Sequence, residues 1–68
     1  MTEKQLADLL QELEKRTALR SSISERILNA REVGDLATNA DYKAAKEDQE
    51  ANEARMSEIR KIIRDAVS

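Results

Sequence analysis

The sequence predicts an all-α protein, a single antiparallel two-helix coiled-coil hairpin with its turn at about residues 34–38. Three observations support this fold class. The 68-residue chain has no Pro and one Gly, and 38% of its residues are charged, a composition typical of long helices. Apolar residues recur at alternating steps of three and four in both halves. The two sets of positions are mirror images about residue 36, as antiparallel pairing of two helices requires.

The first helix is predicted over about residues 3–33. Its inward positions follow the heptad spacing of a coiled-coil seam, and most of them are apolar. At about 1.5 Å per residue, an arm of this length gives a rod of roughly 45 Å. The predicted seam positions are Leu6, Leu9, Leu13, Arg16, Arg20, Ile23, Ile27 and Ala30.

The turn and the second helix, about residues 39–66, are predicted from local patterns. Gly34 can adopt the left-handed conformation that closes a helix. Thr38 followed by Asp41 has the form of a capping box, with Asp in place of the usual Glu. The seam then continues through Tyr42, Ala45, Gln49, Asn52, Met56, Ile59, Ile63 and Ala66.

The mirror symmetry also predicts which residues face each other across the seam. Predicted pairs include Leu9 with Ile63, Leu13 with Ile59, Ile27 with Ala45, Arg16 with Met56, and Arg20 with Asn52. The middle of the seam is therefore polar. We expect the two arginine stems to pack there while their head groups reach Glu50 or Glu53. Polar seam positions more often fix register than perform chemistry.

The open end of the hairpin has a wider apolar face than two helices can cover. Leu10 and Ile62 flank the seam there, beside Leu6 and Ile63. We expect a further domain, a second copy or another partner to dock at this end. For the isolated chain this predicts a weak homodimer.

Composition narrows the function classes. The chain has no Cys and no His, which argues against thiolate chemistry, the common zinc sites and catalytic triads. A net charge of −2 gives no electrostatic case for free nucleic acid as the main ligand. No apolar run approaches the length of a membrane span, and the N-terminus lacks the apolar core of a signal peptide. We expect a cytoplasmic protein that binds a protein partner and no membrane.

The turn region carries a specific motif. Residues 30–49 have the sequence AREVGDLATNADYKAAKEDQ. This segment resembles the tip of the Gre family of bacterial transcript cleavage factors, Ala-Arg-Glu-x-Gly-Asp-Leu-x-Glu-Asn-Ala-Glu-Tyr, followed by Ala-Ala-Arg/Lys-Glu. Weaker likeness to the family's N-terminal coiled coil extends over nearly the whole chain. The matching residues are Ala30, Arg31, Glu32, Gly34, Asp35, Leu36, Asn39, Ala40, Tyr42, Ala44, Ala45, Lys46 and Glu47.

The resemblance implies a function on RNA polymerase. In the family, the hairpin enters the polymerase secondary channel, and tip carboxylates help to hold a catalytic Mg²⁺ and its water. The polymerase's own active site then cuts the nascent RNA near its 3′ end, so the chain would not be an enzyme by itself. Asp35 matches the family's first metal-directed acid and would share the Mg²⁺ with the polymerase. Arg31 and Lys46 match basic positions that would lie near RNA or polymerase.

This chain departs from the family pattern at two tip positions. Thr38 stands where the family has a Glu, and a hydroxyl is a poor substitute for a carboxylate ligand. Asp41 replaces the family's Glu with a shorter acid, and the start of a helix favours acids in any case. Tyr42 lies on the seam, which favours a place in the core over a role in stacking. The resemblance places six residues at the tip that would face the polymerase or the RNA: Arg31, Thr38, Asn39, Asp41, Tyr42 and Lys46.

Asp35, Arg31 and Lys46 also have purely structural interpretations. Asp35 can satisfy the amides of a turn. Arg31 and Lys46 can belong to an ordinary solvated face.

Three function hypotheses remain open from the sequence. The first is a transcript cleavage module, either a fragment of a two-domain factor or a short relative, since the family's C-terminal globular domain is absent from the chain. The second is a regulator or inhibitor that occupies the polymerase channel without promoting cleavage, which Thr38 favours. The third is a generic helical hairpin that dimerises into a four-helix bundle.

Overall fold

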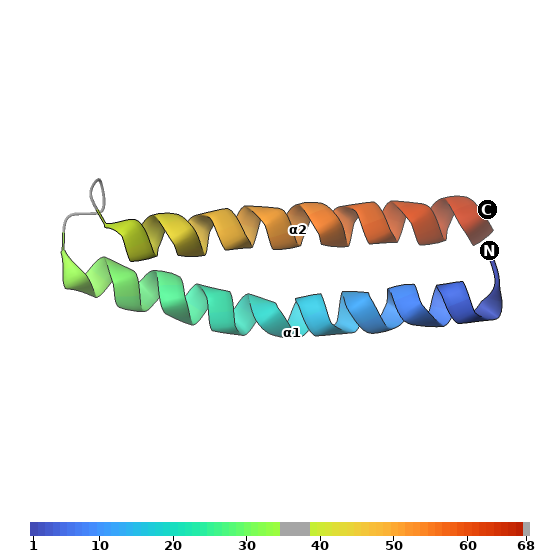
Figure 1. Cartoon of the computed structure of the whole chain (residues 1–68), viewed down its shortest axis with the longest axis horizontal. Helices are drawn as coiled ribbons and strands as arrows, with labels where there is room; N and C mark the ends of the chain where they lie inside the picture. Colours follow the sequence, from blue (N-terminus) through green and yellow to red (C-terminus); the bar gives the residue numbers. More distant parts are fainter. Residues whose placement is uncertain (35–38, 68) are drawn as a thin grey trace.

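The computed structural model describes residues 1–34 and 39–67, and these residues form a two-helix hairpin (Figure 1). Helix α1 spans Glu3–Val33, as predicted. Helix α2 spans Ala40–Val67, so it begins and ends one residue later than predicted. No strand occurs in the described part of the chain. The predicted all-α hairpin is therefore confirmed, while the predicted centre of symmetry at residue 36 lies outside the described residues.

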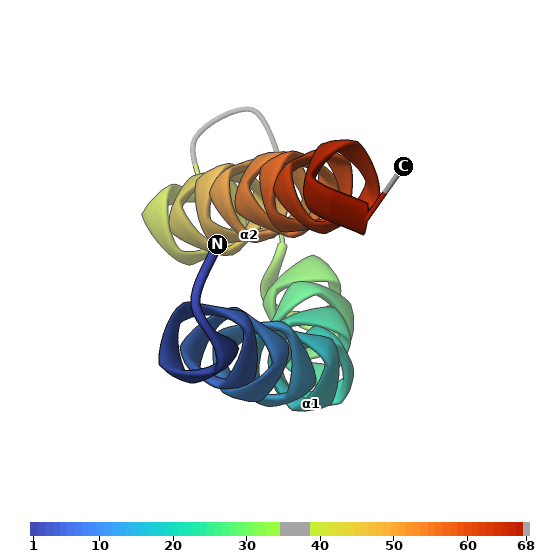
Figure 2. The same cartoon turned by 90° about the vertical axis from the view of Figure 1, so that its right-hand side faces the viewer.

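The hairpin is a narrow rod. Its principal extents are 48 × 16 × 14 Å, close to the length predicted from the helical rise. Both helices run along the long axis of the rod (Figure 1), and the end-on view shows α2 above α1 (Figure 2). The beginning of α1 and the end of α2 meet at one end of the rod. The other end carries the end of α1 and the beginning of α2.

A capping box that was not predicted begins α1. The Thr2 hydroxyl accepts a hydrogen bond from the Gln5 backbone N–H at 3.1 Å. The Gln5 side-chain Oε1 accepts one from the Thr2 backbone N–H at 2.9 Å. The two bonds satisfy N–H groups that have no partner within a helix. The Thr-x-x-Gln spacing of residues 2–5 is a sequence pattern that could have predicted this cap.

Gly34 ends α1, but in a different conformation from the one predicted. Its φ is 147° and its ψ is −140°, whereas a left-handed helical residue has a ψ near +47°. This extended, positive-φ region is accessible almost exclusively to Gly. The backbone leaves the helix here in an extended direction, which still requires the one Gly of the chain.

One cluster of the core lies in the half of the rod that leads to the turn end. Ile23, Ile27 and Ala45 form a buried cluster, and the half-buried Tyr42 packs against it. This cluster contains the predicted pair of Ile27 with Ala45, and it confirms the prediction that Tyr42 belongs to the core. The other buried residues are Ala30, Asn52, Met56 and Ile59.

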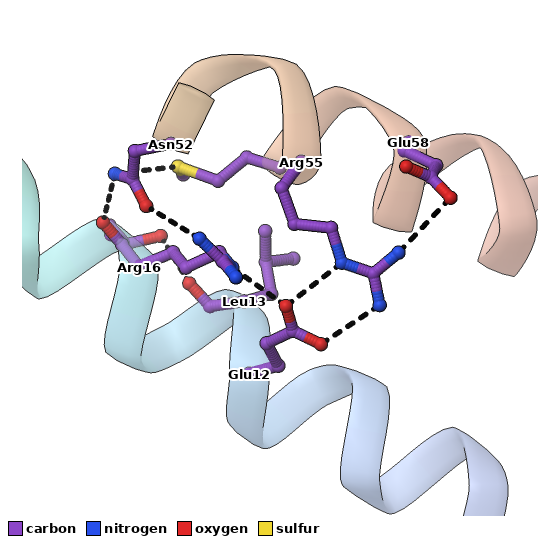
Figure 3. A network of polar contacts seen from close by, with 8 residues as sticks. Glu12, Leu13, Arg16, Asn52, Arg55 and Glu58 are labelled. Carbon is purple, nitrogen blue, oxygen red and sulfur yellow. Dashed lines mark hydrogen bonds and ion pairs between the residues drawn. The ribbon is translucent and has the colours of Figure 1, made fainter. Parts of the chain in front are cut away.

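The middle of the seam is polar, as predicted, but its bonds differ in part from the prediction. Arg20 forms a two-pronged ion pair with Glu53 across the helices, at 2.6 and 2.7 Å, as expected. Arg16 reaches neither Glu50 nor Glu53. Its guanidinium donates to Glu12 Oε2 at 2.7 Å and to Asn52 Oδ1 at 3.3 Å (Figure 3). A partner one turn away on the same helix is closer than a carboxylate on the neighbouring helix, and a buried amide supplies the second contact.

Asn52 is the buried polar residue of the seam, with 4% of its surface exposed. Its Nδ2 donates to the backbone carbonyl of Arg16 at 2.9 Å, so the amide bonds to α1 through both its oxygen and its nitrogen. A slip in register would leave this buried amide without its partners. Asn52 therefore favours one register of the two helices, but it bonds to Arg16 and not to Arg20, the residue predicted to face it across the seam.

Glu12 lies at the centre of a network of charges that links the two helices (Figure 3). It accepts two hydrogen bonds from Arg55, at 2.9 and 3.0 Å, as well as the bond from Arg16. Arg55 also pairs with Glu58 at 3.1 Å. The hydrogen bonds from Arg55, and then from Arg16, lower the pKa of Glu12 from 4.5 to about 2.

The open end is packed loosely. Leu6, Leu9 and Ile63 are half-buried, and Leu10 is 48% exposed. The apolar face is thus wider than the seam, as predicted, while the weak homodimer remains a prediction. Neither described helix has the combination of length and apolar character needed to cross a membrane.

Candidate functional site

The candidate site is the end of the rod where α1 ends and α2 begins. Five of the predicted tip residues are described there: Arg31, Asn39, Asp41, Tyr42 and Lys46. The predicted metal ligand Asp35 and the predicted tip residue Thr38 lie outside the described residues.

Asn39 joins the two helices at this end. Its side-chain Oδ1 accepts a hydrogen bond from the Tyr42 backbone N–H at 3.0 Å, which makes Asn39 the N-cap of α2. Its side-chain Nδ2 donates to the Ala30 carbonyl, in the last turn of α1, at 2.6 Å. The cap was predicted from Thr38 and Asp41; Thr38 lies outside the described residues, and among the described residues the capping bond comes from Asn39. Asn is among the best N-cap residues, but the sequence contains no pattern that predicts its second bond.

Arg31, Tyr42 and Lys46 line one groove on the surface between the helices. The groove has a volume of about 310 Å³ and is also lined by Ser24, Ile27, Leu28 and Gln49. Lys46 is half-buried, and its Nζ donates to Gln49 Oε1 at 3.2 Å. The structure therefore brings Arg31 of α1 beside Tyr42 and Lys46 of α2, which lie eleven and fifteen positions further along the sequence.

Asp41 lines a different groove. It is exposed in the first turn of α2, and its groove is shared with Arg26, Ala30 and Val33. A carboxylate in the first turn of a helix interacts favourably with the helix dipole. The structure does not group Asp41 with Arg31 and Lys46, which agrees with its interpretation as part of a helix start.

The groove of Arg31, Tyr42 and Lys46 has a chemistry suited to a phosphate-bearing chain. Two cationic side chains can contact phosphate oxygens, and the edge of an aromatic ring can contact a base or a sugar. The packing of Tyr42 against the core limits the part of its ring that a ligand can contact.

The described residues contain no group of three or more acidic side chains arranged to hold a metal ion. Residues 1–34 and 39–67 thus do not fit a complete Mg²⁺ site.

Comparison with known proteins assigns the family. Residues 1–67 match the family of the N-terminal domain of transcription elongation factors GreA and GreB. The chain belongs to this GreA/GreB N-terminal family. The resemblance seen in the tip motif is therefore confirmed over almost the whole hairpin.

The similar GreA proteins are longer than this chain. It is 49% identical over 63 residues to the transcription elongation factor GreA of Lachnoclostridium phytofermentans, a match that covers 93% of the chain and 38% of that protein. It is 41% identical over 68 residues to GreA of Bacillus cytotoxicus, covering 98% of the chain and 43% of that protein. A third match, GreA of Nitrobacter hamburgensis, is 52% identical over 54 residues, covering 78% of the chain and 34% of that protein.

The matches thus span between about a third and about two fifths of the length of these GreA relatives. No solved structure matches it.

Proposed function

We propose that this hairpin is the polymerase-inserting module of a transcription elongation factor. In this proposal its turn end enters the secondary channel of RNA polymerase and promotes RNA cleavage by the polymerase's own active site. The observation that carries the proposal is that the described residues of the Gre tip motif lie at the turn end of a rod only 16 × 14 Å across.

The shape suits delivery of a side chain through a pore. A paired helix keeps its backbone hydrogen bonds internal along its whole length, so it can enter a narrow channel without unfolding. The cross-helix pairs of Glu12 with Arg55 and Arg20 with Glu53 hold the two arms together as one unit. The tip residues then reach the far end of the channel at a position set by the length of the rod.

Asp35 is the residue that we propose to act on the metal. Mg²⁺ prefers hard oxygen ligands and keeps several waters, so one additional carboxylate can complete a weakly held site. When bound, the ion would activate a water molecule and stabilise the negative charge that develops during phosphodiester hydrolysis. In this proposal Asp35 offers one carboxylate from the tip. The described residues contain no group of three or more acidic side chains that could hold the ion by themselves.

Arg31 and Lys46 are proposed to contact the RNA near its 3′ end, or the polymerase wall. Their shared groove places both cations beside Tyr42, where a phosphate could lie against them. The net charge of −2 over the chain argues against tight binding of free RNA, so these contacts are expected only within the polymerase complex.

A second candidate function is occupation of the channel without cleavage. Thr38 favours it, because the chain then offers one tip carboxylate where the family pattern offers two. The two functions share the same binding mode and differ only in the chemistry at the tip.

A competition experiment tests the shared binding mode. A labelled intact GreA is bound to RNA polymerase, and the hairpin is titrated against it. We expect displacement, at concentrations well above those needed for unlabelled GreA. A variant with Arg31→Glu and Lys46→Glu should displace less, whereas the matched variant Lys4→Glu, altered at the opposite end of the rod, should displace as well as the wild type. Failure of the hairpin to displace GreA at any concentration would contradict the proposal.

A further inference from the structure

The turn end of the rod has little apolar packing to hold its helices together. In α1, Ala30 is the last buried residue, and Val33 beyond it is 79% exposed. In α2, the residues before Tyr42 are exposed or half-buried. The buried residues nearest this end, Ala30 and Ala45, are small and offer limited contact area.

The side chain of Asn39 supplies the connection that packing does not. Its amide nitrogen bonds to the Ala30 carbonyl at 2.6 Å, and its amide oxygen bonds to the Tyr42 N–H at 3.0 Å. A carbonyl oxygen has two lone pairs, so Ala30 can accept this bond without leaving its helix. Among the described residues, this is the hydrogen bond nearest the turn end that joins α1 to the start of α2. The next cross-helix bond toward the open end joins Arg26 to Asp48.

We infer that Asn39 is a positioning residue for the reaction at the tip. By joining the last turn of α1 to the first turn of α2, it sets the spacing of the two backbone ends between which Asp35 lies in the sequence. This inference rests on the proposed function, because the spacing matters only if the tip presents a carboxylate to the polymerase active site. Small errors in placement cost much in catalysis, since a displacement of about 1 Å can lower a rate about a hundredfold.

The two bonds of Asn39 can be separated by substitution. Asn39→Asp keeps a side-chain oxygen for the Tyr42 N–H but loses the amide hydrogens that bond to Ala30. Asp and Asn are equally good N-caps, so α2 should keep its start. Asn39→Ser also keeps the cap and loses the bond to Ala30, without adding a charge. Asn29→Asp makes the same chemical change at an exposed position next to Ala30 and is the matched control.

A distance measurement tests the spacing directly, without any assay of activity. The chain has no Cys, so Glu32→Cys and Lys43→Cys place two spin labels uniquely, one on each helix at the turn end. Electron–electron dipolar spectroscopy should give a narrow distance distribution for the parent and for Asn29→Asp. It should give a clearly broader one for Asn39→Asp and Asn39→Ser. Equal widths in all four proteins, or equal broadening in Asn29→Asp, would overturn the inference.

A kinetic measurement then tests whether the spacing matters for the reaction. RNA cleavage by backtracked polymerase is measured against hairpin concentration, in the Thr38→Glu background, which carries both tip acids. We expect Asn39→Asp and Asn39→Ser to lower the maximal rate about tenfold or more, with less than a twofold change in the half-saturating concentration. An unchanged maximal rate despite a broadened distribution would overturn the positioning role.

The two measurements also separate this inference from the proposed function. Absence of cleavage with every protein, including the Thr38→Glu parent, would contradict the cleavage function. In that case the distance distributions would still show whether Asn39 fixes the spacing of the helix ends.

Discussion

At the scale of single residues, Gly34 and Asn39 together determine how the two helices end and begin. Gly34 adopts a backbone conformation that other residues rarely reach, and Asn39 caps the following helix while bonding to the preceding one. Gly34 and Asn39 lie five positions apart in the sequence, and neither the backbone conformation of Gly34 nor the hydrogen bonds of Asn39 depend on the hydrophobic core. Backbone and amide chemistry joins the last turn of α1 to the start of α2, whereas packing and cross-helix ion pairs hold the rest of the rod.

Substitution of Gly34 tests whether its backbone conformation is required. Beyond Gly34 and its two chain neighbours, no described atom lies within 4 Å of the position that a Cβ would occupy, so Gly34→Ala has open space for its methyl group. Its φ of 147° is nevertheless strained for any residue with a Cβ. We expect Gly34→Ala to lower the free energy of unfolding by about 1–3 kcal/mol, measured by urea denaturation with circular dichroism. Unchanged stability would mean that this conformation is not required.

Glu12 makes a second prediction at the residue scale, which concerns pH. Because the folded-state pKa of Glu12 is lowered from 4.5 to about 2, its contribution to stability is present above about pH 4.5 and is lost as the pH falls toward 2. The pKa of Glu53 is also lowered, by its hydrogen bonds from Arg20, so it contributes in the same direction. Acid should therefore destabilise the hairpin.

Glu12→Gln removes the titrating carboxylate, so this variant should lack the contribution of Glu12 to the loss of stability in acid. The melting temperatures of the wild type and Glu12→Gln should differ most near neutral pH and converge between about pH 4.5 and 2. Glu14→Gln, at an exposed position two residues away, is the matched control and should follow the wild type at all pH values. A constant difference between wild type and Glu12→Gln down to pH 2 would contradict the role assigned to Glu12.

At the scale of helices, the heptad spacing predicted both elements and most of their inward faces. The helix bounds were predicted to within one residue because the chain has one Gly, no Pro and a long unbroken period. Register was predicted from mirror symmetry, and Ile27 and Ala45 do share one cluster. The partners of Arg16 were not predicted, because a flexible side chain can reach several acceptors and its choice depends on three-dimensional geometry. The second bond of Asn39 was missed for the same reason.

The packing of α2 against α1 can be tested at Ile59, which is fully buried. Ile59→Ala should cost about 2–5 kcal/mol, a large part of the stability of so small a domain, and should lower the helical circular dichroism at room temperature. Leu10→Ala, at a 48% exposed position, should cost much less. Equal costs in urea denaturation would contradict the observed core.

At the scale of the whole molecule, the rod has two unlike ends. The turn end holds the Gre tip motif and the groove of Arg31, Tyr42 and Lys46. The open end holds exposed apolar surface around Leu10 and Val67. Sequence predicted this division, since the motif and the wide apolar face lie at opposite ends of the heptad pattern. It could not predict which tip residues share a groove, because that depends on how the helices face each other.

The open end predicts weak self-association of the isolated chain. Sedimentation equilibrium at millimolar concentration should show a dimer, because apolar side chains there remain uncovered. Leu10→Lys should reduce the dimer fraction, whereas Leu28→Lys, at a similarly exposed position near the turn end, should not. A strictly monomeric wild type would contradict this prediction.

The central claim is that the hairpin acts on RNA polymerase through the carboxylates of its tip. Its most direct test is cleavage of labelled RNA in a stalled, backtracked elongation complex, titrated with each variant at several Mg²⁺ concentrations. The wild type should stimulate cleavage weakly or not at all, because Asp35 offers one carboxylate and Thr38 offers none. Thr38→Glu should increase cleavage, and Asp35→Ala in that background should abolish the increase. Equal cleavage with all three proteins would contradict the claim that the tip acts through the metal.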